Sequence, residues 1–127
     1  MTLNSLVPNA HYDMAHGKPL AIERDQDGSN IFRFNIAPEM GIPEGESQEV
    51  QIGWQCVEIR FWDAPTKANI KRHVIRTFVN ECDEFAMVND YNKHNLGIIQ
   101  DENAVAKYVA FLNFTEEVST VINQVIN

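Results

Sequence analysis

Cysteine is scarce in this chain of 127 residues, and that scarcity excludes one class of protein. Cys56 and Cys82 are the only two cysteines, too few for the disulfide framework of a small secreted protein. We interpret both as small buried hydrophobic residues, which is the usual place of a free cysteine. The sequence therefore indicates a reducing, cytosol-like environment.

Long apolar runs are missing as well. The best candidate, residues 70–79, is interrupted by Lys71, Arg72, His73 and Arg76, whereas a membrane span needs about 18 or more apolar residues in succession. Residues 1–13 lack both the basic region and the apolar stretch of a secretory signal. We expect no membrane association and no secretion by a signal peptide.

Basic residues are also few, with 10 Lys and Arg against 18 Asp and Glu, which gives a net charge of −8. Phosphate neutralisation needs a surplus of cations, so this balance makes nucleic acid an improbable partner. Residues 64–80 are the exception, because they contain four basic residues and no acidic one: Lys67, Lys71, Arg72 and Arg76. Their i,i+4 spacing places them together on one side of a predicted helix. We favour a solvated helix face, and a contact with phosphate or an acidic protein stays open.

Recognisable catalytic, metal and cofactor motifs are missing too. His11, Asp13 and His16 are metal-ligand types, but a zinc site needs three or four fixed ligands on a rigid frame. Residues 90–101 resemble a calcium loop only superficially, because Gly97 comes two positions later than the required glycine. No nucleophile elbow, phosphate loop or dinucleotide fingerprint is present. We expect no metal, no cofactor and no enzymatic activity.

What the chain does contain is a change of character near residues 63–65, from strand-like to helical patterns. Strands followed by helices indicate the α+β class. We predict an extended N-terminal arm over residues 1–19 and one α+β domain over 20–127. In it, a small antiparallel sheet packs against a helical hairpin and a C-terminal helix. The predicted strands lie near 20–24, 29–36 and 49–62, and the predicted helices near 66–80, 83–96 and 101–124.

The strand patterns predict which side chains face the core. In residues 29–36, Phe32 and Phe34 share the apolar side and Arg33 faces the other way. In residues 49–62, the alternation of Val50, Ile52, Trp54 and Cys56 predicts an inward face and a largely buried Trp54. The apolar positions change parity between Cys56 and Val57, which predicts a β-bulge there or a strand buried on both faces. Residues 38–46 are predicted to be a loop.

The helices show start and stop signals. Thr66 is predicted to be the N-cap or a first-turn residue of the first helix. Asp83 is a predicted N-cap, Gly97 a C-cap, and the third helix is predicted to start near Asp101. That helix either continues to the C-terminus or breaks near residues 114–115. The expected inward side chains are Ile70, Val74 and Phe78, then Phe85, Val88, Tyr91 and Asn92, then Val105, Tyr108, Val109 and Leu112.

The predicted arm has few anchors of its own. Its apolar side chains are Leu3, Leu6, Val7 and Tyr12, too few to offset the conformational entropy lost on ordering it. We therefore expect these four residues to be held either by the core of the same chain or by a neighbouring subunit, and we favour the neighbouring subunit.

One stretch of the sequence resembles a known group of proteins. It combines a strand at 57–60, a Pro-Thr helix start at 65–66, the phrase Asn-Asp-Tyr-Asn at 89–92, and a closing Tyr-x-x-Phe-Leu at 108–112. This pattern resembles small proteins from tail or structural gene regions of phages and prophages of gut Bacteroides-type bacteria. The resemblance implies a non-enzymatic structural protein, found in the virion or the bacterial cytoplasm, whose partners are copies of itself or other structural subunits. Two alternatives stay open: a nucleic-acid or acidic-partner binding module, and a small enzyme or ligand-binding domain without a sequence motif.

Overall fold

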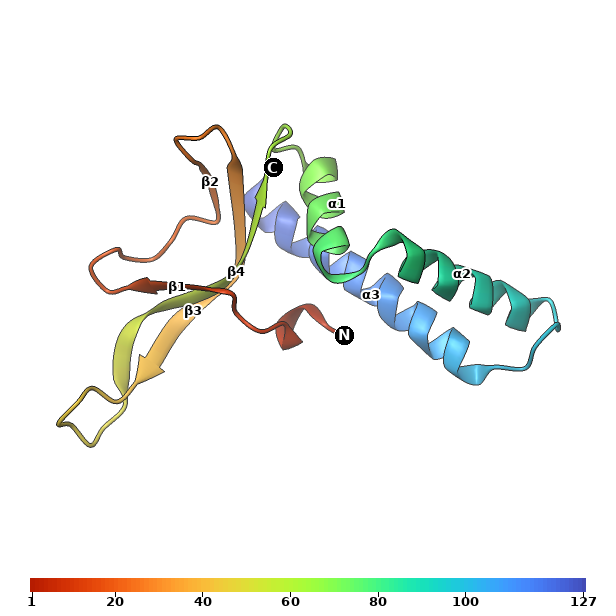
Figure 1. Ribbon diagram of the computed structural model, residues 1–127, viewed down its shortest axis with the longest axis horizontal. Coiled ribbons are helices and arrows are strands. Elements are labelled where there is room, and N and C mark those ends of the chain that lie inside the picture. The colour runs from red at the N-terminus through yellow and green to blue at the C-terminus, as the bar shows by residue number, and fades with distance from the viewer. The chain divides into compact units, whose positions relative to one another are not determined.

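Four strands and three α-helices make up the chain, whose residues 1–127 are all described by the computed structural model (Figure 1). The strands precede the helices along the chain, which confirms the predicted α+β class. The sequence predicts an arm followed by one domain. In the structure the residues group into two compact units, one formed by Leu6–Pro65 and the other by Met1–Ser5 together with Thr66–Asn127.

The first unit is a curled antiparallel sheet with the strand order β1-β4-β3-β2. Its strands are β1 (Ala10–Asp13), β2 (Ile22–Arg24), β3 (Asn30–Gly41) and β4 (Val50–Phe61). Two predictions are corrected here. Strand β1 lies within the predicted arm, and β3 continues through Pro38 into the predicted loop. Because β2 pairs only with Asn30–Phe32, the rest of β3 is a sheet edge, where proline is tolerated.

The predicted bulge occurs in the other strand. Phe34 pairs with Val57 and Ala37 pairs with Gln55, so the extra residue lies in β3, where Asn35 has a φ of 53°. In β4 itself, Cys56 and Val57 are both fully buried. Successive strand residues point to opposite faces, so β4 is buried on both faces at this point. The change of apolar parity arose from that burial.

Beyond Gly53, where the pairing of β4 with β1 ends, β3 and β4 continue as a two-stranded hairpin that extends away from β1 and β2 (Figure 1). Ile52 and Ile42 are 45% and 62% exposed, and Met40 and Val50 are also exposed. Trp54 is only half-buried, with Lys18 Nζ 5.8 Å from the centre of its ring. The predicted inward face of this strand is therefore wrong for its outer half.

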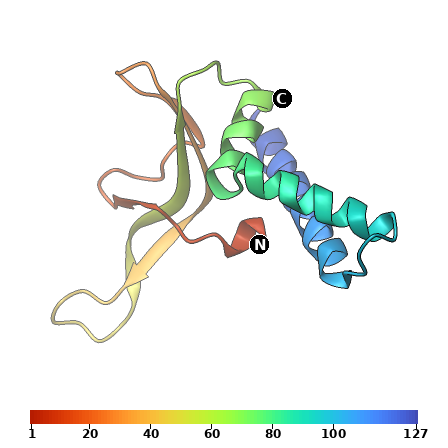
Figure 2. The same ribbon diagram turned by 45° about the vertical axis from the view of Figure 1, so that its right-hand side comes forward.

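The second unit contains α1 (Lys67–Phe78), α2 (Glu81–Asn95) and α3 (Glu102–Val125) (Figure 2). Helix α3 is continuous, which settles the alternative left open by the sequence. It packs against both other helices. The buried side chains of α1 and α3 are Ile70, Val74, Ile75, Ala104, Phe114, Val118 and Ile122.

The helix ends follow most of the predicted signals. Thr66 and Asp101 cap α1 and α3 as predicted, and Gly97 follows α2 with a φ of 75°. The prediction for the start of α2 is wrong, because Asn80 is the cap and accepts a hydrogen bond from the backbone N–H of Asp83. Asp83 lies in the first turn of α2, where its carboxylate stabilises the helix dipole without being the cap.

The predicted inward face of α2 is largely wrong. No residue of this 15-residue helix is buried, and Phe85 is 60% exposed. Its contact with α3 includes the rings of Tyr91 and Tyr108, whose centres are 4.8 Å apart. On α3, Val109 and Leu112 are exposed as well. Packing against α3 covers only one narrow side of α2, and this leaves the remaining apolar side chains in solvent.

Candidate functional site

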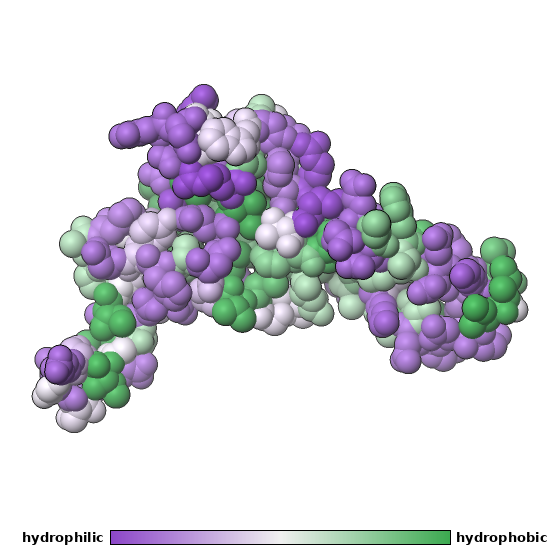
Figure 3. Space-filling view, viewed as in Figure 1, coloured by the Kyte–Doolittle hydropathy of each residue, from purple (hydrophilic) through white to green (hydrophobic).

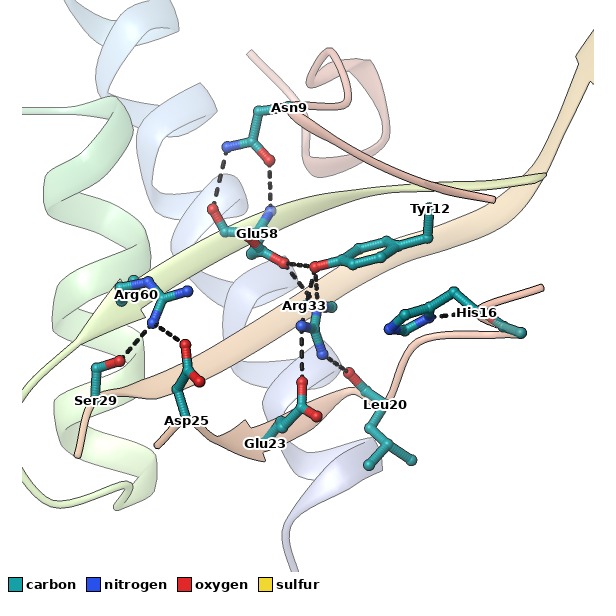
Figure 4. Close-up of polar contacts among 11 residues, drawn as sticks. Asn9, Tyr12, His16, Leu20, Glu23, Asp25, Ser29, Arg33, Glu58 and Arg60 are labelled. Carbon is teal, nitrogen blue, oxygen red and sulfur yellow. Dashed lines mark hydrogen bonds and ion pairs between the residues drawn. The ribbon is translucent and has the colours of Figure 1, made fainter. Parts of the chain in front are cut away.

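A buried arginine is the centre of the densest polar cluster in the chain. Arg33 on β3 is only 3% exposed, and its guanidinium contacts all three other strands or their flanks (Figure 4). Nε donates to Glu58 Oε1 on β4 at 2.8 Å, and Nη2 pairs with Glu23 Oε1 on β2 at 2.8 Å. Nη1 donates to the Leu20 carbonyl at 2.9 Å, and Nη2 donates to the Tyr12 hydroxyl at 3.0 Å. The Tyr12 hydroxyl in turn donates to Glu58.

The charges in this cluster stabilise one another. Burial alone lowers the pKa of Arg33, but its hydrogen bonds to Glu58, Glu23 and Tyr12 outweigh burial and raise that pKa above its usual value. Burial raises the pKa of Glu58, and the hydrogen bonds from Tyr12 and Arg33 outweigh it, so the pKa lies below its usual range. Burial and the hydrogen bond to Glu58 raise the pKa of Tyr12. Near neutral pH the cluster therefore holds a charged arginine, a charged glutamate and a neutral tyrosine.

Two neighbouring contacts extend the cluster along the sheet. The side chain of Asn9 bonds the backbone of Glu58 twice, donating to its carbonyl at 3.1 Å and accepting from its N–H at 2.7 Å. At the other end, Arg60 Nη1 pairs with Asp25 Oδ2 at 2.8 Å and donates to Ser29 Oγ at 2.6 Å. These contacts join β4 to the segment before β1 and to the turn between β2 and β3.

Chemically, this arrangement is a clamp for the short edge strands. Buried side-chain nitrogen and oxygen atoms all have hydrogen-bond partners, and the guanidinium is fully used within the sheet. Sequence reasoning placed Arg33 on the polar side of its strand and missed its partners. The signal that could have found them is a charged residue in the middle of an apolar strand, since such a charge needs a partner of opposite sign.

The histidines near the N-terminus make separate contacts. His11 Nδ1 pairs with Glu39 Oε1 at 2.7 Å. Asp13 Oδ1 accepts a hydrogen bond from the backbone N–H of His16 at 2.8 Å, and the His16 ring lies 4.5 Å from that of Tyr12. No three His, Cys, Asp or Glu side chains come together as a potential metal site.

The four basic residues of α1 do not form one uniform surface. Arg76 is tied to α2, because its Nη1 pairs with Glu84 Oε1 at 2.9 Å. Lys67 and Lys71 form no ion pair, and they line a groove of about 240 Å³ whose other side is α3, with Ser119 and Asn123. Lys71, Arg72 and Arg76 also line a shallower groove of about 420 Å³ beside it. Of the two predicted i,i+4 pairs, Lys67 and Lys71 therefore place two ammonium groups without ion pairs in the same groove.

The predicted arm contacts are largely used within the chain. Leu3 is buried, and its backbone N–H donates to Glu117 Oε2 on α3 at 2.8 Å. Tyr12 belongs to the Arg33 cluster, and Leu6 is half-buried. Val7 alone of the four is well exposed, at 80%. The chain's own residues thus supply tethers for the N-terminal segment.

Two hairpins carry most of the large apolar side chains in solvent, although Trp62 and Leu20, 66% and 63% exposed, lie on neither. The β3–β4 hairpin carries Met40, Ile42, Val50 and Ile52, and the α2–α3 hairpin carries Phe85, Leu96, Ile98, Ile99, Val109 and Leu112. Figure 3 shows apolar side chains gathered toward the far end of each hairpin. An apolar groove of about 220 Å³, lined in part by Met87, Ala110 and Phe111, lies on the helical unit.

The two cysteines differ in environment. Cys56 is fully buried and its pKa is raised by burial and by the nearby charge of Glu58. Cys82 is exposed in the first turn of α2, so the prediction that both are buried is wrong for this residue.

None of the helices combines the length and the apolarity that crossing a membrane requires. Comparison of the chain with protein-family models, with curated proteins and with solved structures finds no match in any of the three.

Proposed function

We propose that this chain is a non-enzymatic structural protein that acts by binding other protein chains, as a virion or tail-associated component of a phage or prophage. The observation that carries the proposal is the pair of hairpins with large apolar side chains in solvent. Ile98 and Leu96 at the end of α2–α3 are 67% and 75% exposed. Exposed apolar clusters of this kind mark protein interaction surfaces.

The energetics of α2 support the same proposal. This helix has 15 residues and buries none of them. Helices of about 12–15 residues are marginal in water unless an apolar side packs against something. A bound protein partner would cover Phe85, Leu112 and their neighbours and so stabilise the hairpin. The resemblance of residues 57–112 to phage structural proteins supplies the class of assembly.

One specific observation favours a second function. Lys67 and Lys71 are unpaired and lie together, as they would in a binding module for nucleic acid or for an acidic partner. The net charge of −8 argues against nucleic acid. Titration of the chain into a fluorescent DNA duplex at low salt tests for nucleic-acid binding. A protein that binds only other protein chains leaves the fluorescence anisotropy of the duplex unchanged.

The main experiment is co-expression of the chain with the proteins encoded by its neighbouring genes, followed by purification and mass measurement of any complex. We expect a complex of fixed stoichiometry, formed with a neighbour or by the chain alone. The variant Phe85→Ser/Leu96→Ser/Ile98→Ser should weaken it about tenfold or more, since central apolar anchors dominate interface energies. A control is Leu20→Ser, which changes an apolar residue of similar exposure, 63%, on neither hairpin. A wild-type chain that stays monomeric with every neighbour would contradict the proposal.

A further inference from the structure

The tip of the β3–β4 hairpin is strongly acidic. Between Arg33 and Arg60 the chain has no Lys or Arg, and the loop carries Glu44, Glu46 and Glu49. All three are exposed, and none forms an ion pair. Like charges on one loop repel one another, and a cationic partner surface would offset the repulsion.

Apolar side chains flank this acidic tip. Met40 in β3, Ile42 just after it, and Val50 and Ile52 in β4 are 38–62% exposed. A two-stranded hairpin is marginally stable in water without a covering layer. The tip therefore has the composition of an interface: an apolar stem with charges of one sign at its end.

The complementary surface lies on the helical unit. In the groove between α1 and α3, Lys67 and Lys71 supply two ammonium groups without ion pairs, and Ser119 and Asn123 supply polar groups. Arg76, one turn beyond Lys71, is already neutralised by Glu84. In a chain with a net charge of −8, an unpaired cationic pair attracts acidic groups.

We propose that the acidic hairpin tip of one copy of this chain docks on the Lys67/Lys71 groove of a second copy. This inference rests on the proposed function and names its partner. The tip of each copy would bind the groove of the next, which makes the contact heterologous. Such a contact leaves one free tip and one free groove after every addition, so it builds rings or open filaments rather than a closed dimer.

The test exchanges charges between the two surfaces. The tip variant is Glu44→Lys/Glu46→Lys/Glu49→Lys, and the groove variant is Lys67→Glu/Lys71→Glu. Both change exposed or half-exposed side chains, so the fold should persist, and circular dichroism checks this. Sedimentation velocity then measures assembly at about 50 mM and about 500 mM salt, which screens exposed charges.

We expect wild-type assemblies at low salt that shrink at high salt, and about tenfold weaker assembly for each variant alone. Mixing the two variants should restore assembly, because each then presents a tip and a groove that suit the other. The double-swapped chain should also assemble by itself. A matched control, Lys18→Glu/Arg24→Glu, makes the same charge change at two exposed residues of the sheet unit, outside the tip, the groove and the α2–α3 hairpin, and should assemble like wild type.

Three results would overturn the inference. One is a wild-type chain that stays monomeric, another is assembly that neither charge variant weakens. The third is rescue by the double-swapped chain without rescue by mixing, which would place the contact within one chain. If the charge variants change nothing while Phe85→Ser/Leu96→Ser/Ile98→Ser abolishes assembly, the proposed function stands and this inference fails.

Discussion

Arg33 places a permanent positive charge in the middle of the sheet, and its planar guanidinium forms hydrogen bonds to four groups at once. Lysine could not replace it, because a single ammonium cannot reach Glu58, Glu23 and the Leu20 carbonyl in their fixed directions. The sequence predicted on which side of β3 this residue lies. Its partners come from segments 10 to 25 residues away, and no local pattern encodes such pairings.

Replacing this arginine tests its role as a clamp. We expect Arg33→Leu to lower the free energy of unfolding by about 3–5 kcal/mol, since it leaves Glu58 and Glu23 without their buried partner. Urea unfolding followed by tryptophan fluorescence measures the change, because Trp54 and Trp62 both lie in the sheet unit. The exposed pair of Arg60 with Asp25 supplies the control. An unfolding midpoint as low for Arg60→Leu as for Arg33→Leu would contradict the clamp.

Glu58 makes the stability of the sheet depend on pH. Its pKa in the fold lies below its usual range, so its contribution is complete above the unfolded value of about 4.3 and is lost as the pH falls through the folded value. We expect the melting temperature of wild type to exceed that of Glu58→Gln at pH 7. The gap should shrink steadily below about pH 4. A gap that is independent of pH would show that the charge of Glu58 is not what stabilises the sheet.

At the scale of elements, two glycines of the central strands differ in what a methyl group would meet. A Cβ at Gly53 would overlap the backbone carbonyl oxygen of Tyr12, whereas one at Gly41 would lie 2.7 Å from Ile52 Cδ1, the movable end of a side chain. We expect Gly53→Ala to destabilise the sheet by about 1–3 kcal/mol and to detach β1. Hydrogen exchange of the β1 amides measures this. Equal exchange rates in Gly53→Ala and Gly41→Ala would contradict it.

The elements that sequence reasoning missed share a physical cause. Helices α1 and α3 follow from local capping and spacing, and their predicted bounds agree with the structure to within two residues at each end. Strand β1 has four residues and exists through pairing with Gly53–Cys56, 40 to 46 residues later. Val50, Ile52 and Phe85 have the pattern of core residues, but they have no neighbours in the chain to cover them. Pattern predicts which side is apolar, and only the tertiary structure decides whether it is covered.

For the whole molecule, the N-terminus belongs to the same compact unit as the helices. Leu3 is 4% exposed and Val7 is 80% exposed. We expect Leu3→Ala to lower the free energy of unfolding by about 2–5 kcal/mol, measured by circular dichroism of the helices, and Val7→Ala to change it little. Loss of assembly in Leu3→Ala with unchanged stability would instead support the predicted contact between this segment and a neighbouring subunit.

Because one cysteine is exposed and the other is buried, the rate of thiol modification can report how often the sheet opens. A thiol reagent should modify Cys82 within seconds to minutes, because that side chain is in solvent. Cys56 should react only after the sheet has opened, because its side chain is fully buried. One equivalent should therefore react in the folded protein and a second only as β4 is transiently exposed. The slow rate, followed under native conditions without denaturant, reports how often the sheet opens. If both thiols react at one rate, β4 is not protected.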